Sequence, residues 1–378
     1  MSRKLVLVGG GHAHVEVIRA LAERPEPDLA VTLVTDRLLT PYSGMLPGHI
    51  AGFYSHAEMH IDLGRLARVS GVALIASAAN GIDRASRHVR TTDGRKIPYD
   101  ILSLNVGITP DLSGITGAGR HGMAVKPIST FLERLDALLT DAARPDGPRR
   151  IVLVGGGAAG IELALALKAR LRDVATAGRP FRIAIAAGNR LVPTLNAGVG
   201  QRVRAALARH GVTVLDSFHV VDIHADGIRS EDGRFVEADA VLLSTAAKAP
   251  SWLAETGLAT ADGGFLSIAS TLASITDPAI FAVGDCATVI ADPMPKAGVF
   301  AVRQGAALTG NIRRALRGEP LMPHRPDRNF LTILMTGDGS AIAGRGAWLA
   351  MAGRWVWWWK DWIDRRFMRQ FSEFRREA

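Results

Sequence analysis

Glycines cluster at two places where a short apolar segment gives way to a helix-like one. The first cluster is "VGGGHAHVEV" at residues 8–17, and the second is "VGGGAAGIEL" at 154–163. In a GxGxxG turn the first glycine makes the tight bend, the second lets the backbone approach a pyrophosphate, and the third lets the helix pack closely. The N–H groups at the helix N-terminus then face the phosphates. Both clusters are therefore predicted to bind nucleotides.

The two clusters differ at the third glycine position, where the first has His14 and the second has Gly160. Since His14 carries a side chain, we expect the first helix to lie farther from its strand than the second one does. The residues predicted to contact phosphates are Gly9, Gly11, His12 and Ala13 in the first copy, and Gly155, Gly157, Ala158 and Gly160 in the second.

A strand-like segment follows each predicted helix, at 29–36 and at 181–190. An acid at the end of this second strand usually hydrogen-bonds the ribose of the nucleotide. Asp36, followed by Arg37, fills this place in the first copy. The second copy has no acid there and reaches Arg190, which tolerates or favours a 2′-phosphate. The choice between NADH and NADPH stays open.

Each copy reads as strand, helix, strand, and the copies lie about 146 residues apart. Such β-α-β units build parallel sheets. The sequence therefore predicts an α/β protein with two Rossmann-like, doubly wound domains. A proline- and glycine-containing segment at 144–149 is a plausible linker into the second copy.

The composition narrows the class of protein. Apolar residues make up 48% of the 378 residues, charged residues 21%, and the net charge is +9. The basic residues form no single block, so nucleic acid is not favoured as a partner. Cys286 is the single cysteine, which excludes a disulfide framework and suits a reducing, cytoplasmic compartment. No apolar run reaches the roughly 18 residues that a membrane-spanning helix needs.

A third motif, "SITDPAIFAVGDCA" at 274–287, ends in Gly284 and Asp285. It resembles the second flavin motif of the two-dinucleotide-binding-domain flavoproteins, the pyridine nucleotide-disulfide oxidoreductase superfamily. This resemblance implies FAD at the first glycine cluster, with Asp285 on the ribityl chain, and NAD(P)H at the second. It also implies an FAD domain at 1–112 and 256–320, an inserted NAD(P) domain at 113–255, and a C-terminal domain at 321–378.

A narrower resemblance links the chain to type II NADH dehydrogenase-like proteins, including a flavoprotein domain fused elsewhere to selenide water dikinase. It rests on "GGGHAHV", "PYSGMLPGHIAGFY", "KAGVFAVRQG" and "WKDWIDRRFM". Two departures matter. Ala247 replaces an expected glycine, and Gly298 stands where a glutamine beside the quinone is usual. These departures weaken the case for a quinone as the electron acceptor but do not exclude it.

The resemblance also implies roles for single residues. Glu162 would begin a helix pointing toward nicotinamide and flavin, although a favourable position in the helix dipole explains it equally well. A helix at 296–310 would face the flavin with its N-terminus, and Lys296 would add charge or be merely solvated. Tyr42 would stack on the flavin or simply pack. The remaining candidates are Gln304 for catalysis, and Pro41, Gly107, Ala297 and Gly298 for cofactor binding.

The tail "RWVWWWKDWIDRRFMRQFSEF" at 354–374 combines tryptophans with basic residues. Apolar residues at 355, 358, 359, 362, 363, 367, 371 and 374 fall close to one helical face. This pattern is typical of a helix lying in a membrane surface. Lys360, Arg365, Arg366 and Arg369 supply positive charge on the rest of the helix. The alternative is a helix packed on the FAD domain or on a second copy in a homodimer. Asp361 and Asp364 favour this alternative, because they make the polar face mixed in charge.

The leading hypothesis is an FAD-dependent NAD(P)H oxidoreductase that passes electrons to an acceptor such as a quinone. One alternative is a flavin reductase with a soluble acceptor, and another is a flavin-bound accessory or sensor protein with little turnover. Cys286 is expected to be a buried small hydrophobe. His12 and His14 lack further clustered ligands, so no metal site is predicted.

Overall fold

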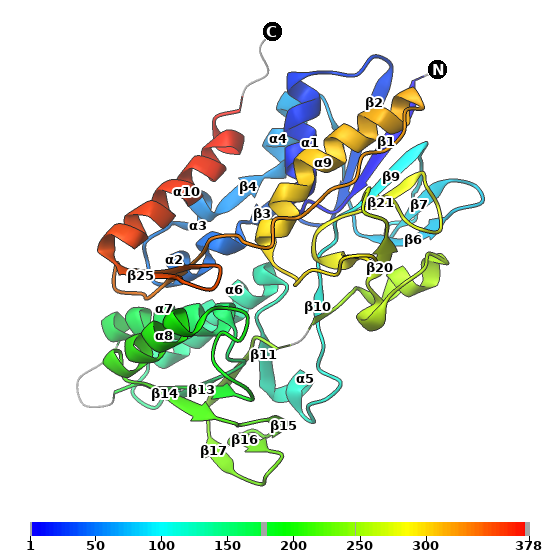
Figure 1. Ribbon diagram of the computed structural model, residues 1–378. Coiled ribbons are helices and arrows are strands. Elements are labelled where there is room, and N and C mark those ends of the chain that lie inside the picture. Colours follow the sequence, from blue (N-terminus) through cyan, green and yellow to red (C-terminus); the bar gives the residue numbers. More distant parts are fainter. Residues whose placement is uncertain (1, 175–179, 246, 375–378) are drawn as a thin grey trace.

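A computed structural model describes residues 2–174, 180–245 and 247–374 of the chain (Figure 1). Two parallel sheets of five strands dominate it, each with helices packed against it. The predicted α/β class with two Rossmann-like sheets is confirmed. Residues 1, 175–179, 246 and 375–378, which belong to three of the predicted domains, lie outside the described residues.

The first sheet combines strands from both ends of the sequence. Its order is β21-β9-β1-β2-β5, and every neighbouring pair is parallel. The central strand is a run of β-branched and leucine residues that are buried on both faces, as a covered parallel strand requires. The bounds are β1 Arg3–Val8, β2 Leu29–Thr35, β5 Ala73–Ala76, β9 Ile101–Leu104 and β21 Ile280–Ala282.

Helices α1 (His12–Glu23) and α9 (Gly298–Arg317) lie side by side against this sheet (Figure 1). Gly305 permits the close approach, because a Cβ there would lie 2.7 Å from the Cβ of Glu16. The helix predicted at 296–310 thus begins two residues later and continues to Arg317. This packing directs the N-terminus of α9 toward the first glycine turn.

The second sheet is drawn from the middle of the chain alone. Its order is β11-β18-β12-β13-β14, again parallel throughout. The strands are β11 Gly122–Ala124, β12 Arg150–Val154, β13 Arg182–Ala187, β14 Val212–Asp216 and β18 Ala240–Leu243. The helices of this half are α5 Ala118–His121, α6 Ile128–Ala142, α7 Ala158–Val174 and α8 Ala197–Arg209.

Each half also carries a three-stranded antiparallel sheet. These are β6 Ala79–Asp83, β7 His88–Thr91 and β8 Lys96–Pro98, and β15 Val220–Ile223, β16 Gly227–Ser230 and β17 Phe235–Glu237. Short elements complete the halves: β3 Leu39–Pro41, α2 Leu46–Ile50, α3 His56–Met59, β4 His60–Asp62, α4 Leu63–Ser70, β10 Thr109–Pro110, β19 Ala247–Lys248, β20 Leu266–Ile268 and β22 Ala287–Val289.

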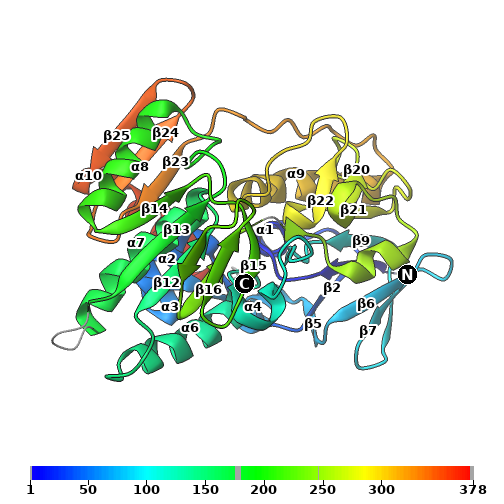
Figure 2. The ribbon, with the colours of Figure 1, turned by 90° about the horizontal axis from the view of Figure 1, so that it is seen from below.

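The C-terminal elements bridge the two halves. Strands β23 (Thr332–Met335), β24 (Ala341–Arg345) and β25 (Leu349–Gly353) form an antiparallel sheet that lies against α8 and α10 (Figure 2). Helix α10 (Arg354–Ser372) then crosses to β4 of the first half. No helix in the described ranges is long and apolar enough to cross a membrane.

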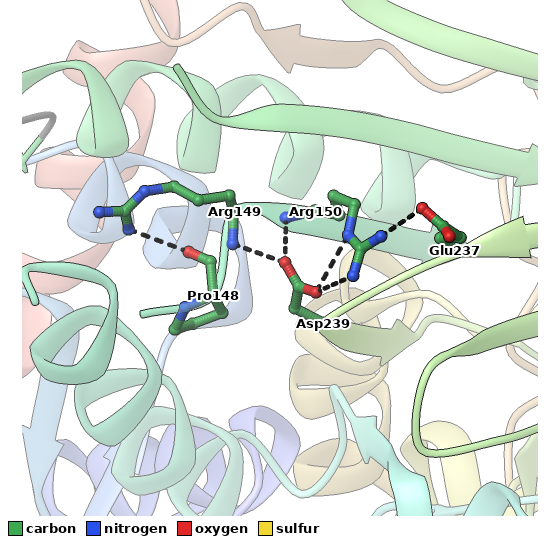
Figure 3. Close-up of polar contacts among 5 residues, drawn as sticks. All are labelled: Pro148, Arg149, Arg150, Glu237 and Asp239. Atoms are coloured by element: carbon green, nitrogen blue, oxygen red, sulfur yellow. Dashed lines mark hydrogen bonds and ion pairs between the residues drawn. The ribbon is translucent and has the colours of Figure 1, made fainter. Parts of the chain in front are cut away.

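A carboxylate fastens the amino ends of two strands in the second sheet. Asp239, just before β18, accepts hydrogen bonds from the backbone N–H groups of Arg149 and Arg150, each at 2.8 Å, and from the Arg150 guanidinium (Figure 3). Arg150 also pairs with Glu237. Burial alone would raise the pKa of Asp239, but the Arg150 guanidinium and the two N–H groups lower it to about 2.

We expect Asp239→Asn to lower the free energy of unfolding by about 2 kcal/mol at pH 7. The native pKa of Asp239 lies below the ordinary 3.8, so the stabilisation is present above about pH 4 and is lost as the pH falls toward 2. Urea-induced unfolding at pH 7 and pH 3 measures it, with the exposed Glu255→Gln as control. An equal difference between variant and parent at both pH values would contradict this account.

Candidate functional site

The turn between β1 and α1 fits against the carboxyl end of β9 so closely that side chains are excluded. Gly9 has φ +91°, and a Cβ there would lie 2.3 Å from the carbonyl oxygen of Asn105. A Cβ at Gly11 would lie 2.5 Å from the Asn105 amide group. The backbone N–H groups that begin α1 therefore open onto this edge of the sheet.

His14 replaces the third glycine with a hydrogen-bonded imidazole. It is buried in the first turn of α1, beside Ala13, and its Nδ1 donates to the Gly9 carbonyl at 2.7 Å while its Nε2 accepts from the Ser103 hydroxyl at 2.8 Å. Burial lowers the pKa of His14 to about 4, so the ring is neutral. At Gly160 a Cβ would lie 2.1 Å from the Gly155 carbonyl oxygen. The His14 ring therefore occupies a place that a side chain could not enter at Gly160, and the wider spacing of the first helix stays a prediction.

His12, Asp285 and Lys126 meet beside the first turn. Lys126 donates to Asp285 at 2.7 Å, and both charges act on the His12 ring. Burial lowers the pKa of His12 to about 4, with Asp285 opposing the shift and Lys126 adding to it. His12 Nε2 is shielded from water and has no hydrogen-bond partner among the described residues. Lys126 belongs to none of the sequence motifs, so the sequence did not indicate it as a site residue.

This surrounding fits a dinucleotide. An unpartnered, shielded ring nitrogen, an aspartate and a side-chain-free turn are what a polar chain with a pyrophosphate needs. The buried Asn105 amide nitrogen is also without a partner in the part of the chain that the structure describes. Gly107 has φ +71°, and a Cβ there would meet no atom within 4 Å, so this residue leaves open space at the same edge.

The N-terminus of α9 reaches the same place. A Cβ on Gly298 would lie 2.9 Å from the Ser43 hydroxyl, which follows Pro41 and Tyr42. Gln304 accepts from the Gly284 N–H at 2.6 Å and thereby holds the turn that carries Asp285. The structure thus brings the candidate segments 41–43, 284–285 and 296–298 together.

Lys296 is partly buried and bound rather than solvated. Its ammonium donates to the Ala287 carbonyl and to the Thr288 hydroxyl, and lies 4.2 Å from the centre of the Phe265 ring. Burial lowers the pKa of Lys296, while Cys286 and Asp285 oppose the shift. Its charge therefore lies near the Asp285 turn, directed toward β22.

The second glycine turn repeats the geometry of the first. Gly155 has φ +123°, and a Cβ there would lie 2.3 Å from the Ser244 carbonyl oxygen. Gly157 has no atom within 4 Å of such a Cβ, so its backbone can be approached from outside, just before α7 begins at Ala158. At the strand ends, Asp36 and Arg37 are exposed after β2, and Arg190 is exposed after β13.

Glu162 lies where the second half meets the C-terminal elements. Its carboxylate accepts from the Met335 N–H of β23 at 2.9 Å. Burial raises the pKa of Glu162 to about 7, against the opposing effects of Lys360 and the Met335 N–H. A carboxyl group with this pKa is near half protonation at neutral pH.

Helix α10 contributes residues that sequence periodicity assigned to its polar face. Lys360 and Asp364 are instead buried, pair at 2.6 Å, and Lys360 also donates to the Gly44 carbonyl at 2.7 Å. Tyr42 hydrogen-bonds Asp364 and packs 4.6 Å from Phe367. The expected face was therefore wrong, because partners from the first half satisfy these two charges.

Four of the five tryptophans of α10 point outward, and Trp357 points inward. Its buried side consists of Val356, Trp357, Lys360, Asp364, Met368 and Phe371. Trp358 is 63% exposed and Trp362 52%, and Trp355 and Trp359 also reach solvent. The helix both packs on the protein and presents an aromatic outer surface.

Two other features lie outside this site. Cys286 is fully buried, and burial raises the pKa of its thiol to about 11. Among the described residues, no three His, Cys, Asp or Glu side chains are grouped to hold a metal. A pocket lined by Pro148, Arg149, Arg150, Arg182 and Asp239 lies at the amino ends of β12 and β13, opposite the glycine turns.

The sequence and fold match known proteins. The chain is 29% identical over 310 residues to a probable ferredoxin reductase, CtmF of Castellaniella defragrans, covering 78% of this chain and 69% of that protein. It is 21% identical over 344 residues to the NADH dehydrogenase-like protein YutJ of Bacillus subtilis, covering 88% and 89%. NDH2 from Plasmodium falciparum, solved with NADH, shares the fold with a TM-score of 0.81 at 14% identity, covering 99% and 98%.

A family profile described as pyridine nucleotide-disulphide oxidoreductase matches residues 3–305, from β1 through both glycine turns and the Asp285 turn into α9. The chain belongs to this family, whose members use FAD together with NAD(P)H.

Proposed function

We propose that the protein binds FAD at the first glycine turn and NAD(P)H at the second, and passes electrons from NAD(P)H to an acceptor. The observation that carries this proposal is the meeting of His12, Asp285 and Lys126 beside the Gly9 turn, with His12 Nε2 unpartnered among the described residues. Bound FAD supplies the hydride and electron chemistry, while the protein binds and orients the reactants.

The first site divides its work among backbone and side chains. The N–H groups that begin α1 suit the pyrophosphate, and Asp36 suits the adenosine ribose. Lys126 binds one carboxylate oxygen of Asp285. The other oxygen would accept hydrogen bonds from hydroxyl groups of the cofactor. His12 is neutral at pH 7, and its second ring nitrogen faces the Pro41 carbonyl, so Nε2 serves as an acceptor.

The partial positive charge at the N-terminus of α9 would stabilise negative charge on the reduced cofactor. Ala297 and Gly298 present the N–H groups that carry this charge, and Lys296 adds to it. Gln304 is a positioning residue, since it acts on the Gly284 N–H. We also propose that the FAD domain comprises residues 1–112 and 256–320, the NAD(P) domain residues 113–255, and the C-terminal domain residues 321–378.

Glu162 is proposed as the proton carrier for the acceptor. Reducing an acceptor such as a quinone takes up protons as well as electrons, so a carboxyl near half protonation is useful there. Lys360 and Asp364 lie close enough to shift its pKa in opposite directions. Their contacts with Gly44 and Tyr42 connect this group to the first site.

A lipid-soluble acceptor, such as a quinone, is the candidate that α10 supports. Tryptophans with basic neighbours favour the interface of a membrane. Trp355, Trp358, Trp359 and Trp362 are exposed on one side of α10, whose other side contacts Tyr42. An acceptor dissolved in lipid would then approach the protein at α10, the helix that covers Tyr42 of the first site.

A soluble protein acceptor is the second candidate. CtmF carries the name of a ferredoxin reductase, and the present chain has Gly298 where type II dehydrogenases place a glutamine. Under this alternative the tryptophan surface would pack on another protein, for example a second copy of the chain.

For the flavin site, we expect the purified protein to show flavin absorbance after reconstitution with FAD, and to lose it anaerobically on adding NADH or NADPH. Asp285→Ala should weaken FAD retention by at least about tenfold, because a charge-assisted hydrogen bond is worth about 1.5–3 kcal/mol. Asp262→Ala, at an exposed acid, is the control. No flavin absorbance would contradict the proposal, and flavin that neither nucleotide bleaches would favour an accessory protein.

For the proton carrier, we expect the rate of acceptor reduction to change with pH around pH 7, as one limb of its pH profile, because the pKa of Glu162 is about 7. Glu162→Gln should abolish this limb. Lys360→Met should move it to higher pH, because a neighbouring positive charge lowers the pKa of Glu162, and Asp364→Asn should move it to lower pH. Shifts of both variants in the same direction would contradict the assignment.

For membrane contact, we expect the protein to sediment with anionic lipid vesicles. Trp358→Gln combined with Trp362→Gln should weaken this binding more than about tenfold, because two exposed aromatic side chains that would enter the lipid surface are lost. Phe235→Gln, at an exposed aromatic on β17, is the control. If the double variant binds vesicles normally but loses a dimer seen in the parent, the tryptophans form a protein interface instead.

A further inference from the structure

The end of β13 lacks the acid that would recognise a ribose hydroxyl. This strand finishes at Ala187, and the following Gly188, Asn189 and Arg190 carry no carboxylate. In a nucleotide held on the Gly155 turn, the 2′ group of the adenosine ribose lies at the end of this strand. The groups around Gly188 therefore decide which 2′ substituent is accepted.

His219 packs directly over that strand end. A Cβ on Gly188 would lie 2.8 Å from the Nδ1 atom of His219, so the imidazole lies directly against the Gly188 backbone. The side chain of His219 is exposed, but its backbone is held in place. The neighbouring Phe218 is buried, and the His219 carbonyl accepts from the Glu231 N–H at 2.8 Å. The backbone therefore presents the imidazole at the end of this strand.

Two neighbouring carboxylates are already paired with arginines. Asp216 lies beside Ala187 in the sheet, and Arg204 of α8 binds both of its oxygens at 2.8 and 3.0 Å. Asp232 is held by Arg234 at 2.8 Å. Arg234 also donates to the carbonyls of residues 216 and 217. These two acids therefore offer little repulsion to an incoming phosphate.

Arg190 has donors to spare. Its Nη2 donates to the Pro193 carbonyl at 2.8 Å, which holds the guanidinium at the turn after β13. Its Nε and Nη1 have no hydrogen-bond partner in residues 2–174, 180–245 and 247–374. Arginine and histidine donors are the groups that recognise a phosphate dianion.

We propose that His219 and Arg190 bind the 2′-phosphate of NADPH, so that NADPH rather than NADH is the preferred electron donor. This inference rests on the proposed nucleotide site at the Gly155 turn. A 2′-hydroxyl finds no carboxylate in the turn 188–190, whereas a 2′-phosphate finds an imidazole over Gly188 and guanidinium N–H groups of Arg190.

Calorimetric titration of the FAD-reconstituted full chain tests the proposal with two probes that differ only in the 2′ substituent, 2′,5′-ADP (adenosine 2′,5′-bisphosphate) and 5′-AMP. We expect 2′,5′-ADP to bind at least about tenfold more tightly. His219→Gln and Arg190→Gln should each reduce that affinity by about tenfold and leave the affinity for 5′-AMP unchanged. His224→Gln is the matched control, because His224 follows the far end of β15 and is paired with Asp222 at 2.9 Å.

Equal affinities for the two probes would overturn the proposal, as would tighter binding of 5′-AMP. A loss of both affinities in His219→Gln would overturn the role of His219, since it would indicate a purely structural contribution. Flavin that is bleached equally well by NADH and NADPH refutes the preference while leaving the proposed oxidoreductase function intact. Failure of that function instead appears as missing flavin absorbance.

Discussion

The architecture depends on one steric constraint, which the chain meets twice. At Gly9 and at Gly155 the turn leaving the central strand passes close to a carbonyl at the end of the neighbouring strand, that of Asn105 or Ser244. A Cβ at either glycine would lie 2.3 Å from that carbonyl oxygen. Both turns have positive φ, so only glycine satisfies them without strain. The helix that follows each turn is thereby placed with its N-terminus at the carboxyl edge of a parallel sheet. Everything else in the two sites is arranged around these edges.

The same repeated constraint explains why so much of the fold was predictable. The strands and helices around both turns lie within a few residues of their expected places, because local apolar runs and glycines encode them. The partners of the candidate residues were not predictable in this way. Lys126 reaches Asp285 from 159 residues away, and Glu162 meets Met335 from 173 residues away. Such contacts are set by packing of distant segments, which a single sequence does not reveal.

The tail illustrates the limit of periodicity most clearly. Hydrophobic spacing placed the tryptophans together, but it could not tell which side of the helix would face the protein. The outcome depends on Lys360 and Asp364, which are four residues apart and can pair while buried. Removing two charges from water is costly unless every donor and acceptor is matched. Gly44 and Tyr42 complete that match, so Lys360 and Asp364 turn inward with their apolar neighbours. Trp355, Trp358, Trp359 and Trp362 turn outward.

In this orientation α10 contacts the first site with one side and exposes tryptophans on the other. Phe367 on the inner side packs against Tyr42, and Tyr42 lies edge-on to His12 at 5.4 Å, so the helix is one aromatic layer away from the first glycine turn. The second turn is open at Gly157 and bordered by cationic and imidazole groups at the end of β13. An electron donor and an electron acceptor would therefore approach from different elements of the chain. Separate approaches would let both substrates be bound at once, so neither would have to leave before the other arrives.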